Sequence, residues 1–427
     1  MTRAPSTLGP WARAFALASF VHLTLPDFDQ AGWRGPQVVE ALGALILLIR
    51  PHPLGFLLCA AGTLWPLLLL RDVLTQSALL TLWALIGLAG GGRRGPAALT
   101  AVRWTTAATY LLAVLHKLNT AWFDPTISCA EHAWAQVVAR YGVPTLPAPA
   151  YVALAVEVGL ALLVLRRSPW AWPVGLAFHL PLTVTLAPAF GPVMLAGYAA
   201  AITARQRVRW RRALRRGWPV AALAAGLAGV GEYLLAGRGE GFVALKVAAG
   251  AGLAVLALDV IAHERPRDRG RAAGGLLPVV ATALWVANGL TPYLGLQYQH
   301  TAAMLSGLRI DTGCHNSLVL PEALRLVDPY VRIDAARIGA GERPGRERKL
   351  RETLWNLPAL HTMRANWCIP ENRPIALAGT WQGVAFSLPD LCDDGWRRAL
   401  PGEAEVLPGL QRFQKNLGRT CPEACIH

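Results

Sequence analysis

Long apolar runs separated by short Arg-, Gly- and Pro-containing connections are the feature that most limits how this sequence can fold. Hydrophobic residues make up 54% of the 427 residues and charged residues only 16%, unlike an ordinary soluble chain. Several runs fall short of the ~20 residues that span a bilayer, so their boundaries are approximate. We expect an all-α polytopic membrane bundle of about eleven helices, at about 11–25, 37–49, 54–70, 73–89, 100–118, 148–165, 170–187, 190–203, 217–236, 242–262 and 275–290.

The arginines predict the orientation of this bundle. One set of alternate connections holds sixteen arginines and the other set holds four. Because basic residues accumulate on the cytoplasmic side, we expect a cytoplasmic N-terminus, with the first span retained rather than cleaved. The chain after residue 291 is then outside the cytoplasmic (inner) membrane. The net charge of +15 is concentrated in these connections, which indicates topology and predicts no nucleic-acid partner.

The composition changes near residue 290, where charge rises and the apolar runs become short. We expect a transmembrane domain over residues 1–290 and an extracytoplasmic domain over 291–427, of small α+β type. Residues 346–368 have the pattern of an amphipathic helix with a basic start. Residues 374–388, PIALAGTWQGVAFSL, alternate around two glycines in the manner of a β-hairpin.

The cysteines agree with this orientation. Cys59 lies within an apolar run, and six cysteines fall on the outer side: Cys129, Cys314, Cys368, Cys392, Cys421 and Cys425. An even number on an oxidising face predicts a disulfide framework, for which six cysteines allow fifteen patterns. Cys421 and Cys425 are expected to form the local pair. Because these two have no convergent histidine pair nearby, no metal site is expected.

Ionisable side chains within or at the end of apolar runs are the candidates for chemistry. Glu157 and His179 lie at similar depth in two consecutive antiparallel spans, so we expect them to meet. They form either a structural pair between helices or the polar floor of a cavity that opens outward. Lys117 ends the run that precedes Asn119, near the mouth of such a cavity. It is either a basic anchor at the interface or a general base.

Three segments carry a resemblance to a known family. They are HKLNTAWFDPTISC (116–129), AFHLPLTVTLAPAFGPVML (177–195) and NGLTPYLGLQYQHTAAMLSGLR (288–309). Together they resemble the vitamin K-dependent γ-carboxylase-like (HTTM) membrane protein family. In these carboxylases a lysine deprotonates a reduced quinone, oxygen attacks, and a peptide glutamate captures carbon dioxide on the lumenal side.

The resemblance implies roles for individual residues. Lys117 matches the base, Trp122 the aromatic residue that follows it, and His179 the histidine of the family's Phe-His helix. Glu157 is a further catalytic candidate, because it lies at the same depth in its apolar run as His179 does. Trp122, Asn119 and His116 are expected at the substrate pocket, although His116 points about 100° away from Lys117 on a helix. The family's Asn-His pair has no counterpart in residues 72–83, DVLTQSALLTLW.

These observations leave three hypotheses of different classes. The first is a carboxylase-like enzyme that acts on a lipophilic, quinone-like substrate, an exported peptide or both, with reduced quinone, O2 and CO2 as co-reactants. The second is a non-catalytic membrane accessory protein for maturation or export of a secreted peptide. The third is a carrier of a small lipophile. The expected partners are the lipid bilayer, a quinone and an exported peptide.

Overall fold

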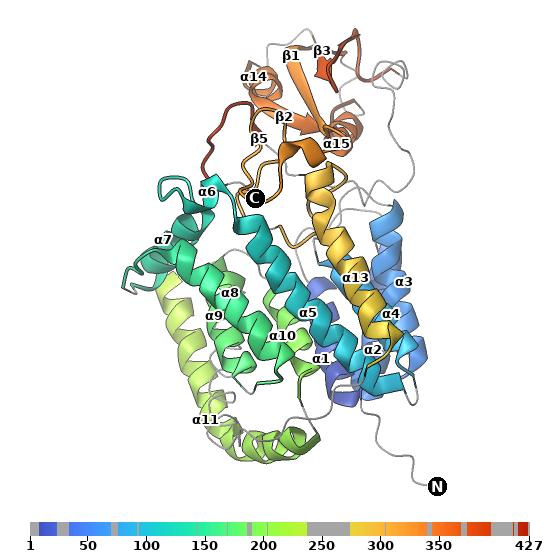
Figure 1. Ribbon diagram of the computed structural model, residues 1–427, viewed down its shortest axis with the longest axis vertical. Coiled ribbons are helices and arrows are strands. Elements are labelled where there is room, and N and C mark those ends of the chain that lie inside the picture. Colours follow the sequence, from blue (N-terminus) through green and yellow to red (C-terminus); the bar gives the residue numbers. More distant parts are fainter. Residues whose placement is uncertain are drawn as a thin grey trace. The chain divides into compact units, whose positions relative to one another are not determined.

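The protein is mostly helical, with a small antiparallel sheet (Figure 1). The computed structural model describes residues 8–23, 34–69, 76–91, 94–142, 144–168, 170–185, 190–202, 204–236, 274–303, 305–339, 344–368, 374–393, 413 and 417–425. The chain forms two compact units. The helical unit comprises Met1–Leu64, Gln76–Leu111 and Ala133–Val286, and the sheet unit comprises Trp65–Thr75, Leu112–His132 and Ala287–His427. The predicted division into 1–290 and 291–427 stays a prediction.

Helices coincide with ten of the eleven predicted apolar runs, and the run at 242–262 lies outside the described residues. These helices are α1 (Gly9–Leu23), α2 (Arg34–Ile49), α3 (Pro53–Leu69), α4 (Ser77–Ala89), α5 (Gly95–Lys117), α8 (Pro149–Leu165), α9 (Ala171–Thr185), α10 (Phe190–Ala199), α11 (Ala204–Ala236) and α13 (Leu276–Leu290). The arginine-rich segment before residue 217, predicted as a connection, is instead the first part of α11. Arginine and alanine are strong helix formers, so nothing there interrupts the helix.

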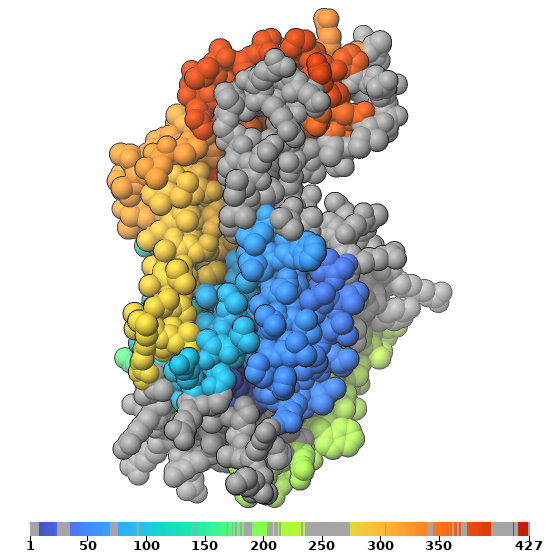
Figure 2. All heavy atoms as spheres, turned by 90° about the vertical axis from the view of Figure 1, so that its right-hand side faces the viewer, coloured from blue at the N-terminus to red at the C-terminus, as the bar shows by residue number. Residues whose placement is uncertain are grey.

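The core of the helical unit is built from close helix contacts. Helix α1 packs against α2 and α10, α10 against α9, and α9 against α8. Trp11, Phe15 and Phe56 form a buried aromatic cluster in which the ring centroids lie 5.5 to 6.1 Å apart. In Figure 2 the blue atoms of the N-terminal helices form one continuous part of the surface. At Gly43 an added Cβ would lie 2.6 Å from the backbone nitrogen of Cys59, so this close approach of α2 and α3 requires glycine.

Two helical segments among the described residues are long and apolar enough to cross a membrane by length and composition. They are Gly95–Lys117, with 23 residues, and Leu276–Leu294, with 19 residues. Five shorter apolar helices cover Gly35–Ile49, Pro53–Leu68, Ser77–Ala89, Pro149–Leu165 and Phe190–Ala199. The bundle of eleven membrane-spanning helices stays a prediction.

Within the described residues the sheet has five strands in the order β4-β3-β1-β2-β5, and every neighbouring pair is antiparallel. The strands are β1 (Tyr330–Ile338), β2 (Thr353–Asn356), β3 (Ile375–Trp381), β4 (Val384–Leu388) and β5 (Leu417–Gly418). The predicted hairpin is confirmed as β3–β4, closed at Trp381↔Val384. Its turn residues Gln382 and Gly383 have φ of 51° and 79°, as a two-residue type I′ turn requires.

The single amphipathic helix predicted over 346–368 is wrong. The segment contains the end of α14 (Pro344–Glu352), the strand β2, and α15 (Leu357–Cys368). Strand β2 lies between β1 and β5, with the pairs Val331↔Trp355 and Leu354↔Leu417. Pairing with residues distant in the sequence therefore overrides the local helical period, which is common for short strands.

Candidate functional site

Asn119 fixes the corner at which α5 ends and the short helix α6 (Thr120–Phe123) begins. Its side-chain oxygen accepts a hydrogen bond from the Trp122 backbone N–H at 2.8 Å, as an N-cap residue does. Its amide group donates to the carbonyl oxygens of His116 (2.7 Å) and Ser306 (2.8 Å). Asn119 is fully buried, so these bonds hold a sharp corner in an environment from which water is excluded.

Lys117 is the last residue of α5 and is buried at this corner. Its side chain does not extend into open solvent, because the residue is only 6% exposed. The Nζ atom lies 5.3 Å from the centroid of the Trp122 ring, within the range of a cation–π contact. Trp122 is itself buried, and the Ser128 hydroxyl donates to its carbonyl oxygen at 2.7 Å. The amine and an aromatic face are thus held together inside the sheet unit.

His116 makes its contacts away from this pair, with the segment that follows α13. Its Nε2 lies 3.0 Å from the Thr301 carbonyl oxygen, which can only accept, so Nε2 is the donor. In the neutral ring, Nδ1 then accepts from the Tyr293 hydroxyl at 3.1 Å. The two rings are also stacked at 5.5 Å. His116 therefore holds α5 to the segment containing Tyr293 and Thr301.

Asn316, which sequence reasoning did not include in the site, completes the corner. Its amide donates to the Gly307 carbonyl oxygen at 2.9 Å, and its side-chain oxygen accepts from the Arg309 backbone at 2.8 Å. Its own carbonyl oxygen accepts from the Thr120 backbone at 3.0 Å. Residues 116–129 and 288–309, two of the segments singled out in the sequence, are thus joined within the sheet unit.

Three disulfides confirm the predicted framework, but the expected local pair Cys421–Cys425 is wrong. The bonds are Cys129–Cys425, Cys314–Cys421 and Cys368–Cys392. Residues 417–425, the C-terminal tail, are held at several separate points, so Cys421 and Cys425 face different partners. The Cys425 backbone donates to the Ile127 carbonyl oxygen at 2.9 Å, beside the start of α7 (Cys129–Tyr141). Cys59 is a free, buried cysteine.

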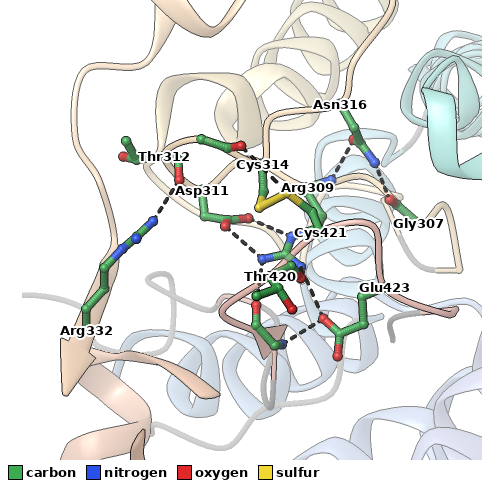
Figure 3. Close-up of a disulfide and its surroundings, with 12 residues drawn as sticks. Gly307, Arg309, Asp311, Thr312, Cys314, Asn316, Arg332, Thr420, Cys421 and Glu423 are labelled. Atoms are coloured by element: carbon green, nitrogen blue, oxygen red, sulfur yellow. Dashed lines mark hydrogen bonds and ion pairs between the residues drawn. A yellow bond between two sulfur atoms is a disulfide. The ribbon is translucent and has the colours of Figure 1, made fainter. Parts of the chain in front are cut away.

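Arg309 anchors the tail beside the Cys314–Cys421 disulfide (Figure 3). Its guanidinium donates to the Asp311 carboxylate at 2.8 and 2.9 Å and to Glu423 at 3.1 Å. It also donates to the Gly418 carbonyl oxygen at 2.8 Å. Burial alone would lower the pKa of Arg309, but the bond to Asp311 and the nearby negative charges raise it above its usual value. This cluster was not predicted, because Gly418 and Glu423 are distant in sequence from Arg309 and Asp311.

In the helical unit, His179 belongs to a separate buried cluster with two tyrosines. The Tyr110 hydroxyl lies 2.6 Å from His179 Nε2 and is also hydrogen-bonded to the Tyr198 hydroxyl. Glu157 is also buried, on α8. The structure thus joins His179 to both tyrosines through the Tyr110 hydroxyl, and the expected contact between Glu157 and His179 stays a prediction. Tyr110 and Tyr198 were missed because tyrosine is unremarkable in an apolar helix.

A second buried polar cluster in the helical unit was also missed. His22 Nδ1 lies 3.3 Å from a Glu40 carboxylate oxygen, and His22 Nε2 lies 3.1 Å from the Ser77 hydroxyl. Both ionisable residues are almost fully buried. The sequence contained a signal for this cluster, because Glu40, like Glu157, is an acidic residue within an apolar run. Within the described part of the chain, no group of three or more His, Cys, Asp or Glu residues could hold a metal ion.

Lys117, Asn119, His116 and Trp122 lie in the sheet unit, whereas Glu157 and His179 lie in the helical unit. A cavity shared by both groups stays a prediction. Comparison with known proteins gave no match to a family model, a curated protein or a solved structure.

Proposed function

We propose that this chain is an integral protein of the cytoplasmic membrane. About eleven helices would span the bilayer, with the N-terminus inside and residues 291–427 outside. Helices lie on ten of the predicted runs, and two helical segments are long enough to cross a bilayer. All six cysteines assigned to the outer face form disulfides, which persist in oxidising compartments. These observations support the membrane location and the orientation.

Within this location we propose a carboxylase-like enzyme in which Lys117 is the general base. The supporting observation is the placement of the Lys117 amine, buried and against the Trp122 ring. A lysine that only anchors a helix end would direct its amine to the interface. An enclosed amine can instead exchange a proton with a bound substrate, and excluding water protects such a step.

The chemistry of this pair fits a flat lipophilic hydroxyl compound such as a reduced quinone. The Trp122 ring would pack against the flat ring, and Lys117 would take a proton from its hydroxyl group. A reduced quinone with oxygen would supply the driving force for adding carbon dioxide to an exported peptide. Asn119 would position Trp122 through its backbone bond, and His116 would fix the end of α5. His179 and Glu157 are proposed as a second polar centre in the helical unit.

The alternative proposal is a non-catalytic accessory protein for the maturation or export of a secreted peptide. One observation favours it: the hydrogen bonds of His116, Asn119 and Asn316 go mainly to backbone groups. Such bonds stabilise a scaffold whether or not chemistry occurs on it.

Lys117→Ala separates the two proposals. The variant would be co-expressed with exported peptides, which are then searched by mass spectrometry for an added carboxyl group. The enzyme proposal expects the modification to disappear while the peptide still co-purifies with the protein. The accessory proposal expects no such modification in any sample and unchanged co-purification. Lys349→Ala is the matched control, because Lys349 is exposed on α14.

A further inference from the structure

The loop that follows Ser317 exposes several large apolar side chains. The exposed fractions are 59% for Leu318, 50% for Val319, 43% for Leu324 and 72% for Leu326. Scattered single apolar residues are ordinary on a protein surface, but a contiguous group marks a contact surface. These four lie within nine consecutive residues, so the loop concentrates exposed apolar side chains in one short segment.

The loop is tied to the ends of both helical segments that are long enough to cross a membrane. The Leu318 backbone N–H donates to the carbonyl oxygen of Leu118, the residue after α5, at 2.9 Å. The Leu326 backbone N–H donates to the carbonyl oxygen of Leu294 at 3.0 Å. Leu294 ends the 3₁₀ helix η3 (Thr291–Leu294) and the apolar segment Leu276–Leu294. The loop therefore lies at the level where both segments end.

Several polar groups in and beside the loop are hydrogen-bonded within the protein. Arg325 pairs with Glu322 at 2.9 Å across the 3₁₀ helix η4 (Glu322–Leu324). Its guanidinium also donates to the Ile310 carbonyl oxygen at 2.8 Å and to the Thr312 hydroxyl at 2.9 Å. The Ser317 hydroxyl oxygen accepts from the Val319 and Leu320 backbones. The loop can therefore enter an apolar medium with fewer unpaired polar groups, which lowers the free-energy cost of its transfer from water.

Apolar exposure continues along the neighbouring helical segment. Leu276 is 77% exposed and Leu284 is 61% exposed on α13, and Leu296, just beyond η3, is 43% exposed. In Figure 2, α13 is coloured yellow and the residues after it light orange, and both lie at the surface. In the proposed membrane location lipid surrounds this helical segment, so the loop bonded to its end at Leu294 faces lipid rather than a second protein.

We propose that residues 318–326 form an interfacial loop whose leucine and valine side chains enter the outer leaflet of the bilayer. The occupant of this surface is lipid at the boundary between headgroups and acyl chains. The loop would set the depth of the α5–α6 corner, since Leu318 is bonded to the residue that follows Lys117. This inference rests on the membrane location in the proposed function but not on any enzymatic activity.

The test places an environment-sensitive fluorophore on single introduced cysteines in the full-length protein. Separate variants carry Leu318→Cys and Leu326→Cys in the loop, Leu284→Cys on α13, and Val384→Cys on β4 as the matched control. Val384 is apolar and 70% exposed, like Leu326, but belongs to the sheet. The parent protein, whose only free cysteine is buried, is the labelling blank. Each sample is placed in phosphatidylcholine nanodiscs with nitroxide-labelled lipid, the label either near the headgroup or deep in the acyl chain.

We expect labels at Leu318 and Leu326 to lose emission to the shallow nitroxide, the Leu284 label to lose it to the deep nitroxide, and the Val384 label to be unaffected. If the label at Leu284 is quenched but both loop labels are as unaffected as the label at Val384, the proposal of an interfacial loop is wrong and the membrane location stands. If Leu284 is unquenched as well, the membrane location itself is wrong, and the loop proposal fails with it.

Discussion

Cys129, at the start of α7, is disulfide-bonded to Cys425, 296 residues later in the sequence. The bond joins the segment that follows Trp122 to the C-terminal tail. The Cys314–Cys421 bond adds a second link between this tail and the segment after α13. Lys117 therefore belongs to a unit whose parts are distant in sequence and are held together covalently.

We expect peptide mapping without reductant to recover three linked pairs: Cys129 with Cys425, Cys314 with Cys421, and Cys368 with Cys392. Replacing Cys129 and Cys425 together by serine should destabilise the sheet unit by about 2–5 kcal/mol, the usual effect of removing a native bridge. Its protease sensitivity in native membranes would measure this loss. Recovery of a Cys421–Cys425 peptide, or of six alkylated thiols, would contradict the pairing.

Arg309→Met should strongly destabilise the sheet unit. The substitution removes the guanidinium that pairs with Asp311 at 2.8 Å, and Asp311 is only 1% exposed. Losing one partner of a buried ion pair costs about 3–5 kcal/mol, because the remaining charge has no compensation. The control is Arg348→Met, which breaks an exposed pair with Glu352 and should cost less than about 1 kcal/mol. Equal denaturant midpoints for the two variants would refute a central role for Arg309.

Asn119 should not tolerate aspartate, although aspartate is an equally good N-cap residue. A carboxylate at this position would accept from the Trp122 backbone but would face the carbonyl oxygens of His116 and Ser306 without protons to donate. Asn119→Ala should cost about 1–3 kcal/mol, and Asn119→Asp at least as much. Thr126→Ala, at an exposed turn, is the control. Thermal unfolding measures all three, and a stable Asn119→Asp variant would contradict the two donor bonds.

The orientation predicts the behaviour of reporter fusions. A reporter active only outside the cytoplasm should be active after Arg309 and silent after Arg212. The disulfides of the sheet unit require an oxidising side, whereas the arginines of α11 favour the cytoplasm. The reverse pattern would overturn the assignment of an outer face to residues 291–427.

Local patterns in the sequence were sufficient for the helices on ten apolar runs and for the β3–β4 hairpin, because apolar run length, hydrophobic period and turn residues act within a short segment. They were insufficient for β2, whose strand conformation depends on pairing with β1 and β5. The disulfide partners depend on how the tail residues 417–425 are held by Arg309 and Ile127. The Tyr110–His179–Tyr198 cluster combines residues from three helices, and no local pattern identifies such a combination.

The proposed role of Lys117 depends on proton transfer rather than on positive charge. Lys117→Arg keeps a long basic side chain that can stack on Trp122, but arginine stays protonated in proteins and cannot take up a proton. Lys117→Met keeps a long stem without an amine and serves as a second variant if arginine does not fit. Thermal unfolding in detergent would show that each variant is folded.

The most direct measurement is the carboxylation of co-expressed exported peptides by parent protein and folded Lys117→Arg, quantified by mass spectrometry. General-base catalysis contributes about 10²–10⁴-fold, so we expect modification by the parent and a loss of at least about 100-fold in the variant. Equal modification by the two proteins, or none by the parent, would contradict Lys117 as a catalytic base.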